Sequence, residues 1–151
     1  MKHPVKFRMF LFWKLPAAFF SGVCIREIDE DRSVVSVPFK WLTQNPFRST
    51  YFASLAMAAE MSTGALAMIH VYKRKPAVSM LITNMQASYH KKATGKTFFS
   101  CEGGRQIHDA VELSVVSGEA RSITVKSTGT NKDGELIAEF IFIWSFKVKT
   151  V

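Results

Sequence analysis

Apolar and polar positions alternate most regularly near the end of the sequence. Every second residue from Leu136 to Val148 is apolar, including Phe140, Phe142 and Trp144, and this period of two predicts a β-strand over residues 135–148. The middle of the segment is apolar on both faces. We therefore expect this strand to lie centrally in a sheet, with both of its faces covered.

Strand patterns dominate the rest of the second half. We expect strands over residues 78–89, 97–101 and 120–128, and one or two helical turns over 106–116. The turn-forming segment 129–134 predicts a hairpin between the last two strands. The strand over 78–89 is expected to have two apolar faces. One comprises Val78, Met80 and Ile82, and the other Leu81, Met85 and Tyr89.

The first half combines helices with two short strands. A helix is predicted over residues 7–20, with Phe10, Trp13 and Ala17 spaced for one face and Pro16 limiting or kinking it. We expect it to pack on its own domain, and a membrane-surface role is the minor alternative. Strands are expected over 22–28 and 33–39, followed by a loop over 43–49.

The segment 50–71 is the longest apolar stretch, and we expect it to form a helix capped by Ser49 or Thr50. Its 22 residues would pass a length test for a membrane span. However, it consists mostly of Ala, Ser, Thr, Met and Gly, carries the carboxylate of Glu60 near its middle and has cations at both ends. A helix buried in protein is therefore the better interpretation, with no membrane span.

The organisation of the chain predicts one domain over residues 1–151, because no linker, repeat or low-complexity tract divides it. The apolar run 9–13 is shorter than the core of an export signal. Cys24 and Cys101 both fall in predicted strands, which favours inert core thiols over a disulfide framework. Together these features predict a cytoplasmic protein. Short strands, a long apolar helix and then long antiparallel strands give an α+β fold class.

The net charge of +8 favours an anionic partner: nucleic acid, a membrane surface or a phosphorylated small molecule. Most Phe and Trp residues fall in the N-terminal helix and the last strand, where their pattern predicts core positions. This disfavours nucleic acid, which needs exposed aromatic residues among the cations. The four histidines lie at no metal-binding spacing, so no metal site is expected.

Glu60 is the residue whose chemistry needs an explanation. No Lys, Arg or His lies between Ser49 and Ile69, and the helical neighbours of Glu60 are mostly small. A buried carboxylate without a partner is costly. Two alternatives remain open from the residue pattern. Glu60 is either a structural carboxylate bound to a backbone amide or an arginine, or a functional acid in a cleft.

Asn45, the run Tyr51-Phe52-Ala53 and Glu60 resemble the signature of the hotdog-fold thioesterase superfamily, in particular its phenylacetate-pathway type. Glu60 follows Tyr51 by nine residues, and Tyr51 stands where that family has His. Phe52 and Ala53 stand in place of two glycines. The stretches 45–53 and 57–64 are similar to a largely uncharacterised bacterial branch of the superfamily, and the order of predicted elements also matches.

The resemblance implies a hotdog fold, in which an antiparallel sheet wraps a long central apolar helix, with an extra N-terminal helix. It also implies a homodimer, or a dimer of dimers, that acts on acyl-CoA or acyl-carrier-protein thioesters. By position, Glu60 would be the general base or nucleophile, and Asn45 would position water or the substrate carbonyl. Tyr51, at the position of the family's His, would belong to the catalytic site, and the amides of Phe52 or Ala53 would face the oxyanion. Coenzyme A enters as part of the substrate, and no cofactor is implied.

Substrate-binding candidates are basic and methionine residues. Arg48 and the basic runs 73–75 and 91–96, with Lys91 and Lys92, could meet coenzyme A phosphates, or form a solvated charged face. Met57 and Met61 could line an acyl tunnel, or belong to the core. A non-catalytic module that binds acyl thioesters or lipids on the same fold is the alternative function. A dehydratase is disfavoured, because no His lies near Asn45 or Tyr51.

Overall fold

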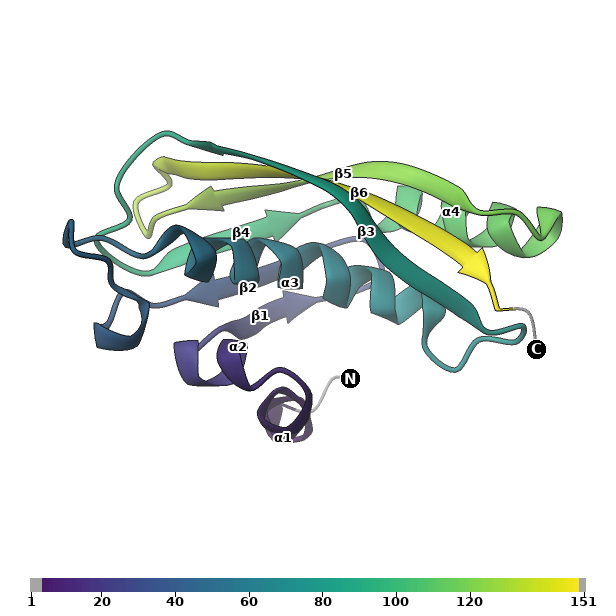
Figure 1. The fold of residues 1–151 in the computed structure, drawn as a ribbon, viewed down its shortest axis with the longest axis horizontal. Coiled ribbons are helices and arrows are strands. Elements are labelled where there is room, and N and C mark those ends of the chain that lie inside the picture. Colours follow the sequence, from purple (N-terminus) through teal and green to yellow (C-terminus); the bar gives the residue numbers. More distant parts are fainter. Residues whose placement is uncertain (1–3, 150–151) are drawn as a thin grey trace.

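The computed structural model describes residues 4–149. The elements are, in chain order, α1 (Pro4–Lys14), α2 (Pro16–Ser21), β1 (Cys24–Ile28), β2 (Ser33–Val37), the 3-10 helix η1 (Trp41–Thr43), α3 (Phe52–Val71), β3 (Val78–Tyr89), β4 (Thr97–Cys101), α4 (Gly104–Ser117), β5 (Arg121–Thr130) and β6 (Leu136–Val148). The six strands form one antiparallel sheet in the order β1-β2-β4-β5-β6-β3, which curves around α3 (Figure 1). The expected α+β hotdog architecture is confirmed.

Helix α3 is the core of this fold. Leu55, Ala58, Ala59, Leu66 and Ala67 are each at most 3% exposed, so the helix is enclosed around most of its circumference. Within the described residues it is the one helix long and apolar enough to cross a membrane, and most of its apolar window is buried inside the protein. The sequence prediction of a core helix is therefore confirmed.

The cap of α3 differs from the prediction. The helix begins at Phe52, its N-cap is Tyr51, and no side chain caps it. Ser49 and Thr50 were the expected caps, but both are buried in the preceding loop. Thr50 uses its N–H and its Oγ1 to donate to the carbonyl of Ala93, at 2.8 and 3.1 Å. A tertiary contact thus takes the hydroxyl that a local cap would have used.

Strand β6 lies between β5 and β3, as its pattern predicts. Its inward residues Phe140, Phe142 and Phe146 are at most 1% exposed. The expectation that both faces are covered was wrong, because Ile141 on the outer face is exposed and Ile143 is half-buried. The two helices that pack on the sheet, α3 and α4, do not cover this outer face (Figure 1).

Strand β3 forms one edge of the sheet, and a bulge changes which side chains share a face. Its register against β6 shifts between Ile82 and Asn84. As a result Met85 pairs with Phe142 and therefore points to the inner face, as Ile82 does. Tyr89, opposite the buried Ala138, also points inward. The prediction that Met85 and Tyr89 lie on the face opposite Met80 and Ile82 was wrong, because the extra residue reverses the alternation.

The N-terminal segment forms two helices where one was predicted over 7–20. The break falls at Pro16, which begins α2, in line with the limiting role expected of it. The predicted inner face was wrong. Trp13 is 74% exposed and Phe10 and Ala17 are also exposed, whereas Leu11 and Ala18 are the buried residues.

The remaining elements agree with their predictions within a few residues. Helix α4 extends the expected turns and buries Ile107, Ala110 and Val111. The hairpin between β5 and β6 is formed, with Gly129 opposite Ala138. A Cβ at Gly129 would lie 2.4 Å from the ring of Phe99, so glycine makes room there for a core aromatic ring.

Candidate functional site

A groove of about 570 Å³ lies at the start of α3. Its walls come from the loop before α3, the first turn of α3 and the segment after β3. Of the predicted site residues, it brings together Asn45, Tyr51, Phe52, Lys91 and Lys92. The structure thus places side chains from two distant parts of the sequence around one space.

Asn45 holds the loop that forms one wall. Its Oδ1 accepts hydrogen bonds from the backbone N–H groups of Phe47 at 3.0 Å and Ser49 at 3.2 Å, and its Nδ2 donates to Ser49 Oγ at 3.1 Å. These bonds close an Asx-type turn. Arg48 sits in this turn at φ 57°, exposed and outside the lining of the groove. The amide of Asn45 is therefore engaged with its own loop.

The first turn of α3 presents free hydrogen-bond donors. The carbonyl of Tyr51 accepts from Ser54 N–H at 2.9 Å and from Leu55 N–H at 3.3 Å. Within the described part of the chain, the N–H groups of Phe52 and Ala53 have no acceptor. Free amides at a helix N-terminus favour a negatively charged oxygen. The rings of Tyr51 and Phe52 meet edge to face at 4.7 Å beside these donors.

Glu60 lies two turns further along α3 and is half-buried. Burial raises the pKa of its carboxyl above the ordinary value of 4.5. No cation or hydrogen-bond donor among residues 4–149 contacts this carboxylate. The structural partner considered from the sequence, a backbone amide or an arginine, is therefore not found in the described residues.

The carboxylate of Glu60 is placed by a glycine and a tryptophan. A Cβ on Gly64 would lie 2.6 Å from Glu60 Oε1 and 3.4 Å from Trp144 Cζ2. The carboxylate of Glu60 thus lies over Gly64, one turn further along α3, on the side of the helix that faces β6. Trp144 Nε1 donates to Thr63 Oγ1 at 3.0 Å, and Thr63 Oγ1 donates to the carbonyl of Glu60 at 3.0 Å. This chain of bonds holds the turn of α3 that carries the carboxylate.

Glu60 does not line the groove at the start of α3. At 1.5 Å per residue, its backbone lies about 12 Å along the helix axis from that of Phe52. Met57 is half-buried one turn before Glu60, and Met61 belongs to the core with 6% exposure. The predicted residues therefore fall into two groups on one helix, a donor group at its start and the carboxylate further along.

Eight further residues that were not predicted site residues line the groove: Pro46, Phe47, Ser49, Thr50, Leu55, Tyr89, His90 and Ala93. Tyr89, His90 and Ala93 enter the groove because the end of β3 and the segment after it lie against the loop before α3, where Thr50 donates to the carbonyl of Ala93. No local pattern indicates that tertiary contact. Tyr89 lies on the inner face of β3, where it and Met85 remain about half exposed. The inner face of the β3 edge is thus open next to α3.

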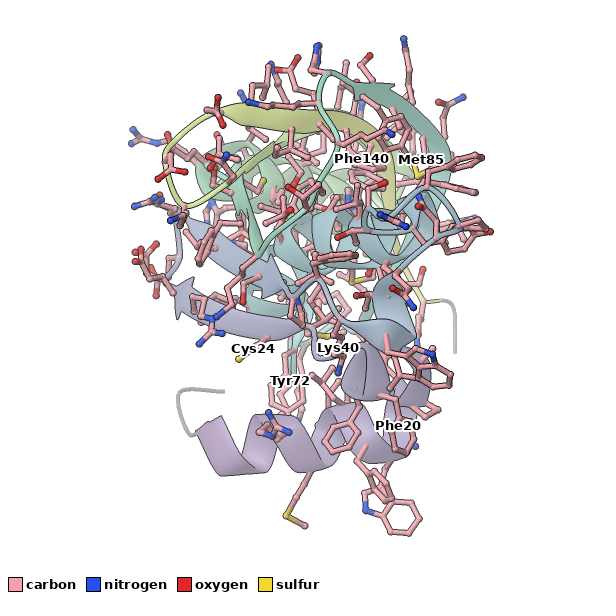
Figure 2. The ribbon with its side chains drawn as sticks, turned by 90° about the vertical axis from the view of Figure 1, so that its left-hand side faces the viewer. Phe20, Cys24, Lys40, Tyr72, Met85 and Phe140 are labelled. Atoms are coloured by element: carbon pink, nitrogen blue, oxygen red, sulfur yellow. The ribbon has the colours of Figure 1, made fainter. Side chains whose placement is uncertain are left out.

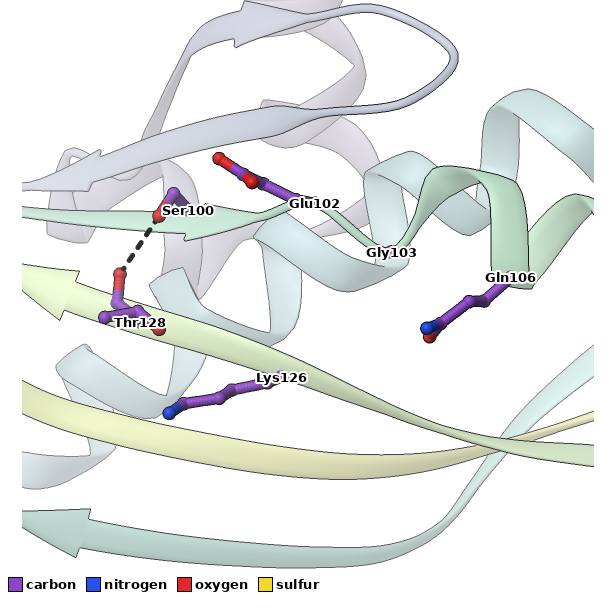
Figure 3. Close-up of a pocket in the computed structure, with 6 residues that line it drawn as sticks. All are labelled: Ser100, Glu102, Gly103, Gln106, Lys126 and Thr128. Carbon is purple, nitrogen blue, oxygen red and sulfur yellow. Dashed lines mark hydrogen bonds between the residues drawn. The ribbon is translucent and has the colours of Figure 1, made fainter.

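A second groove of about 470 Å³ lies between β4, β5 and the start of α4 (Figure 3). Both of its charged side chains are already paired. Glu102 contacts Arg32 Nε at 3.6 Å, and Lys126 contacts Glu139. Ser100 Oγ donates to the carbonyl of Thr128 at 3.5 Å. None of the predicted site residues lines it. Among residues 4–149, no group of three or more His, Cys, Asp or Glu side chains is arranged to hold a metal ion.

Several solved structures share this architecture. A protein of unknown function from Pseudomonas aeruginosa, described as a probable thioesterase, superposes with a TM-score of 0.82 at 17% identity over 99% of each chain. A protein of unknown function from Chlorobaculum tepidum gives 0.81 at 16% identity, over 97% of this chain and 94% of that one. A thioesterase from Haemophilus influenzae gives 0.71 at 11% identity, over 99% and 94%. At these identities the likeness shows the fold.

No curated protein matches the sequence. One family does match, over residues 6–145, and it is described as a domain of unknown function, DUF4442. The match includes both the groove and Glu60. The chain therefore belongs to the DUF4442 family and has the hotdog fold found in thioesterases.

Proposed function

We propose that this protein hydrolyses acyl thioesters of coenzyme A or of an acyl-carrier protein, with Glu60 as the general base. The observation that carries the proposal is a half-buried carboxylate with no cation near it and a raised pKa. A base with a pKa closer to neutral accepts a proton from water more effectively than an ordinary surface carboxylate. The fold shared with thioesterases supports the same reaction class.

In the proposed reaction Glu60 takes a proton from a water molecule, whose oxygen attacks the thioester carbonyl. The carbonyl oxygen becomes an oxyanion, and the free N–H groups of Phe52 and Ala53 stabilise it. When the carbon–sulfur bond breaks, Glu60 returns its proton to the departing thiolate. The products are a carboxylic acid and a free thiol, and no other reactant is consumed.

The two groups of residues require two copies of the chain. One carbonyl cannot contact both Glu60 and the start of the same helix, since they are about 12 Å apart. A homodimer, alone or as a dimer of dimers, would bring Glu60 of one subunit to the donors of the other. The unpaired edge of β3, with Leu81 65% exposed and Met85 about half exposed, is the surface that would pair.

The remaining predicted residues have binding roles in this proposal. Asn45 shapes the wall of the groove and orients the substrate, next to Tyr51. Lys91 and Lys92, with Arg48 on the adjoining loop, bind the phosphates of coenzyme A. Met57, beside Glu60 and half-buried, contacts the acyl chain, and Met61 supports it from the core.

One observation favours the alternative function, a non-catalytic module that binds acyl thioesters or lipids. The rings of Tyr51 and Phe52 stand at the start of α3, about half exposed, where the resembling thioesterases have His and Gly. These rings add apolar surface for a ligand and crowd the donors that an oxyanion needs. Under this alternative the protein binds a thioester without cleaving it.

Thiol release from a panel of acyl-CoAs tests the proposal. Wild-type protein should release thiol, and kcat/KM should rise with pH through a pKa above 4.5. Glu60→Gln should lower kcat/KM by roughly 10²–10⁴-fold, the usual contribution of a general base. The matched control is Glu119→Gln, an identical change on an exposed carboxylate, which should leave turnover unchanged. Saturable binding without thiol release would support the alternative, and full turnover by Glu60→Gln would exclude Glu60 as the base.

Mixing two inactive variants tests the shared site. Phe52→Pro removes one donor N–H at the first helical position, where proline is tolerated. Mixed with Glu60→Gln and allowed to exchange subunits, it should restore about a quarter of wild-type activity, because half the dimers are mixed and one of their two sites is intact. If neither variant is active alone and the mixture also stays inactive despite exchange, each site lies within one subunit.

A further inference from the structure

The N-terminal helices expose an unusual amount of aromatic surface. Trp13 on α1 and Trp41 on η1 are 74% and 79% exposed. Further large apolar side chains of α1, α2, η1 and the junction between α1 and α2 are also exposed: Met9, Phe10, Phe12, Leu15, Phe20 and Leu42. We call this set the N-terminal aromatic face. Leu11 and Ala18 belong to the apolar core, and the partly buried Phe19 packs against it.

This face is an ordered surface. Phe12 meets the rings of Phe19 and Trp13 edge to face, at 5.2 and 5.6 Å. Phe19 and Phe20 meet at 5.4 Å. Lys40 Nζ donates to the carbonyl of Phe20 at 2.8 Å, which ties the start of η1 to the end of α2. The rings of α1 and α2 therefore form one contiguous cluster, and Lys40 ties η1, with its exposed Trp41, to the end of that cluster.

The charges on the segments that form this face all have one sign. Residues 1–26 contain no Asp or Glu, and neither do residues 32–59. Arg8 lies over the ring of Phe19 at 5.2 Å, and Lys14 and Lys40 lie beside the aromatic residues. An anionic partner complements this surface. A second copy would place cations against cations, so charge disfavours self-association through it.

We propose that the N-terminal aromatic face docks the protein on the surface of an anionic lipid bilayer. Exposed Trp and Phe on short helices, next to Lys and Arg, match the polarity gradient of the interface between headgroups and acyl chains. Anionic headgroups attract the cations, while the rings enter the interface. This face would hold the enzyme or binding module where amphiphilic acyl compounds accumulate.

The location of the face is compatible with the proposed dimer. Figure 2 shows Phe20 at the end of the molecule that α1 and α2 form, with Lys40 between that end and the sheet. Met85 on β3 and Phe140 on β6 lie toward the opposite end. Docking through α1, α2 and η1 therefore leaves the β3 edge and the inner face of β3 accessible.

Vesicle sedimentation with the full chain tests the proposal. The protein should bind phosphatidylcholine vesicles that contain about 30% phosphatidylglycerol, bind pure phosphatidylcholine weakly, and dissociate as salt screens the charges. Fluorescence of Trp13 and Trp41 should shift to the blue on binding, while Trp144, 4% exposed, contributes no change. The pair Trp13→Ser and Trp41→Ser should lower the partition coefficient by roughly tenfold or more.

Matched variants exclude general effects of hydrophobicity and charge. Leu113→Ser with Val116→Ser removes exposed apolar side chains from α4 and should leave vesicle binding unchanged. Lys14→Glu should weaken binding more than Lys132→Glu, which alters net charge equally. Absence of binding to phosphatidylglycerol vesicles, or equal binding by both serine pairs, would overturn the proposal. So would a lower oligomeric mass of the tryptophan variant without lipid, because the face would then join copies of the chain.

Discussion

Glu60 on α3 and Glu139 on β6 are both half-buried carboxylates, but their electrostatic surroundings are opposite. Glu139 contacts Lys126 and lies 3.3 Å from His90 Nε2. The hydrogen bond from Lys126 holds the pKa of Glu139 below its usual range. Glu60 has neither kind of partner among the described residues, and burial raises its pKa.

A third half-buried carboxylate, Glu112 on α4, follows the pattern of Glu139, with Arg74 at 2.6 Å. Of the three such carboxylates in residues 4–149, Glu60 alone lacks a cation. A shortage of cations does not explain this, because the chain carries eight more positive than negative charges. The isolation of Glu60 is therefore a local property of α3 and its inner neighbours, as expected for an acid with a chemical role.

Replacing each carboxylate by its amide should change stability in opposite directions. Because folding raises the pKa of Glu60, the folded state favours its proton, and the associated stability is lost as pH rises from 4.5 through the folded pKa. Glu60→Gln should therefore be more stable than wild type near pH 8, by on the order of 1 kcal/mol. The lowered pKa of Glu139 stabilises the fold at neutral pH, so Glu139→Gln should be less stable there.

Denaturant unfolding of both variants between pH 2 and 8 checks this contrast. The higher stability of Glu60→Gln relative to wild type should shrink toward acid pH, because the wild-type carboxyl becomes protonated there. The lower stability of Glu139→Gln relative to wild type should also disappear in acid, once pH falls through the pKa that Glu139 has in the folded wild-type protein. A Glu60→Gln variant that is less stable than wild type at pH 8 would mean that the carboxylate has a stabilising partner. The comparison with Glu139 would then fail.

The elements that could be predicted are those whose apolar residues fit only one arrangement in the core. The apolar segment 50–71 and the alternation before Val148 specify a core helix and an inner strand, and both are observed. Helix α4 is similarly clear, because Ile107, Ala110 and Val111 repeat at helical spacing and are buried. The prediction of which face of α1 is buried was wrong because apolar residues occur on all sides of that helix. The pattern therefore does not select Leu11 as the inward residue.

For the candidate site, the sequence indicates the isolated carboxylate but not its surroundings. That Glu60 lacks a cation on its own helix can be read from the absence of Lys, Arg and His between residues 50 and 69. That no other element supplies one depends on tertiary packing. Likewise, the bulge after Ile82 places Met85 and Tyr89 on the inner face. A bulge is one extra residue with no distinct local pattern, so the face could not be assigned beforehand.

A smaller change, Gly64→Ala, sharpens the comparison of Glu60 with Glu139, because it moves the carboxylate of Glu60 without removing it. Gly64→Ala places a methyl group 2.6 Å from the present position of Glu60 Oε1. The carboxylate is the end of a flexible side chain and should rotate away, while the change from Gly to Ala favours the helix by up to about 1 kcal/mol. Unfolding should therefore show equal or higher stability. The thiol-release assay should show a several-fold lower kcat/KM, because the base has left its position.

The control for this substitution is Gly95→Ala, where a new Cβ meets nothing within 4 Å and neither stability nor turnover should change. The informative result is that Gly64→Ala keeps or gains stability while its kcat/KM falls. If that variant instead loses more than about 1 kcal/mol, the methyl group is displacing Trp144, which lies 3.4 Å from the same point, and the core resists the change. If stability rises and turnover is unaffected, the exact placement of Glu60 does not limit the reaction. Unlike Glu139, which its cations hold in place, Glu60 would then be a carboxylate whose exact position limits neither stability nor turnover.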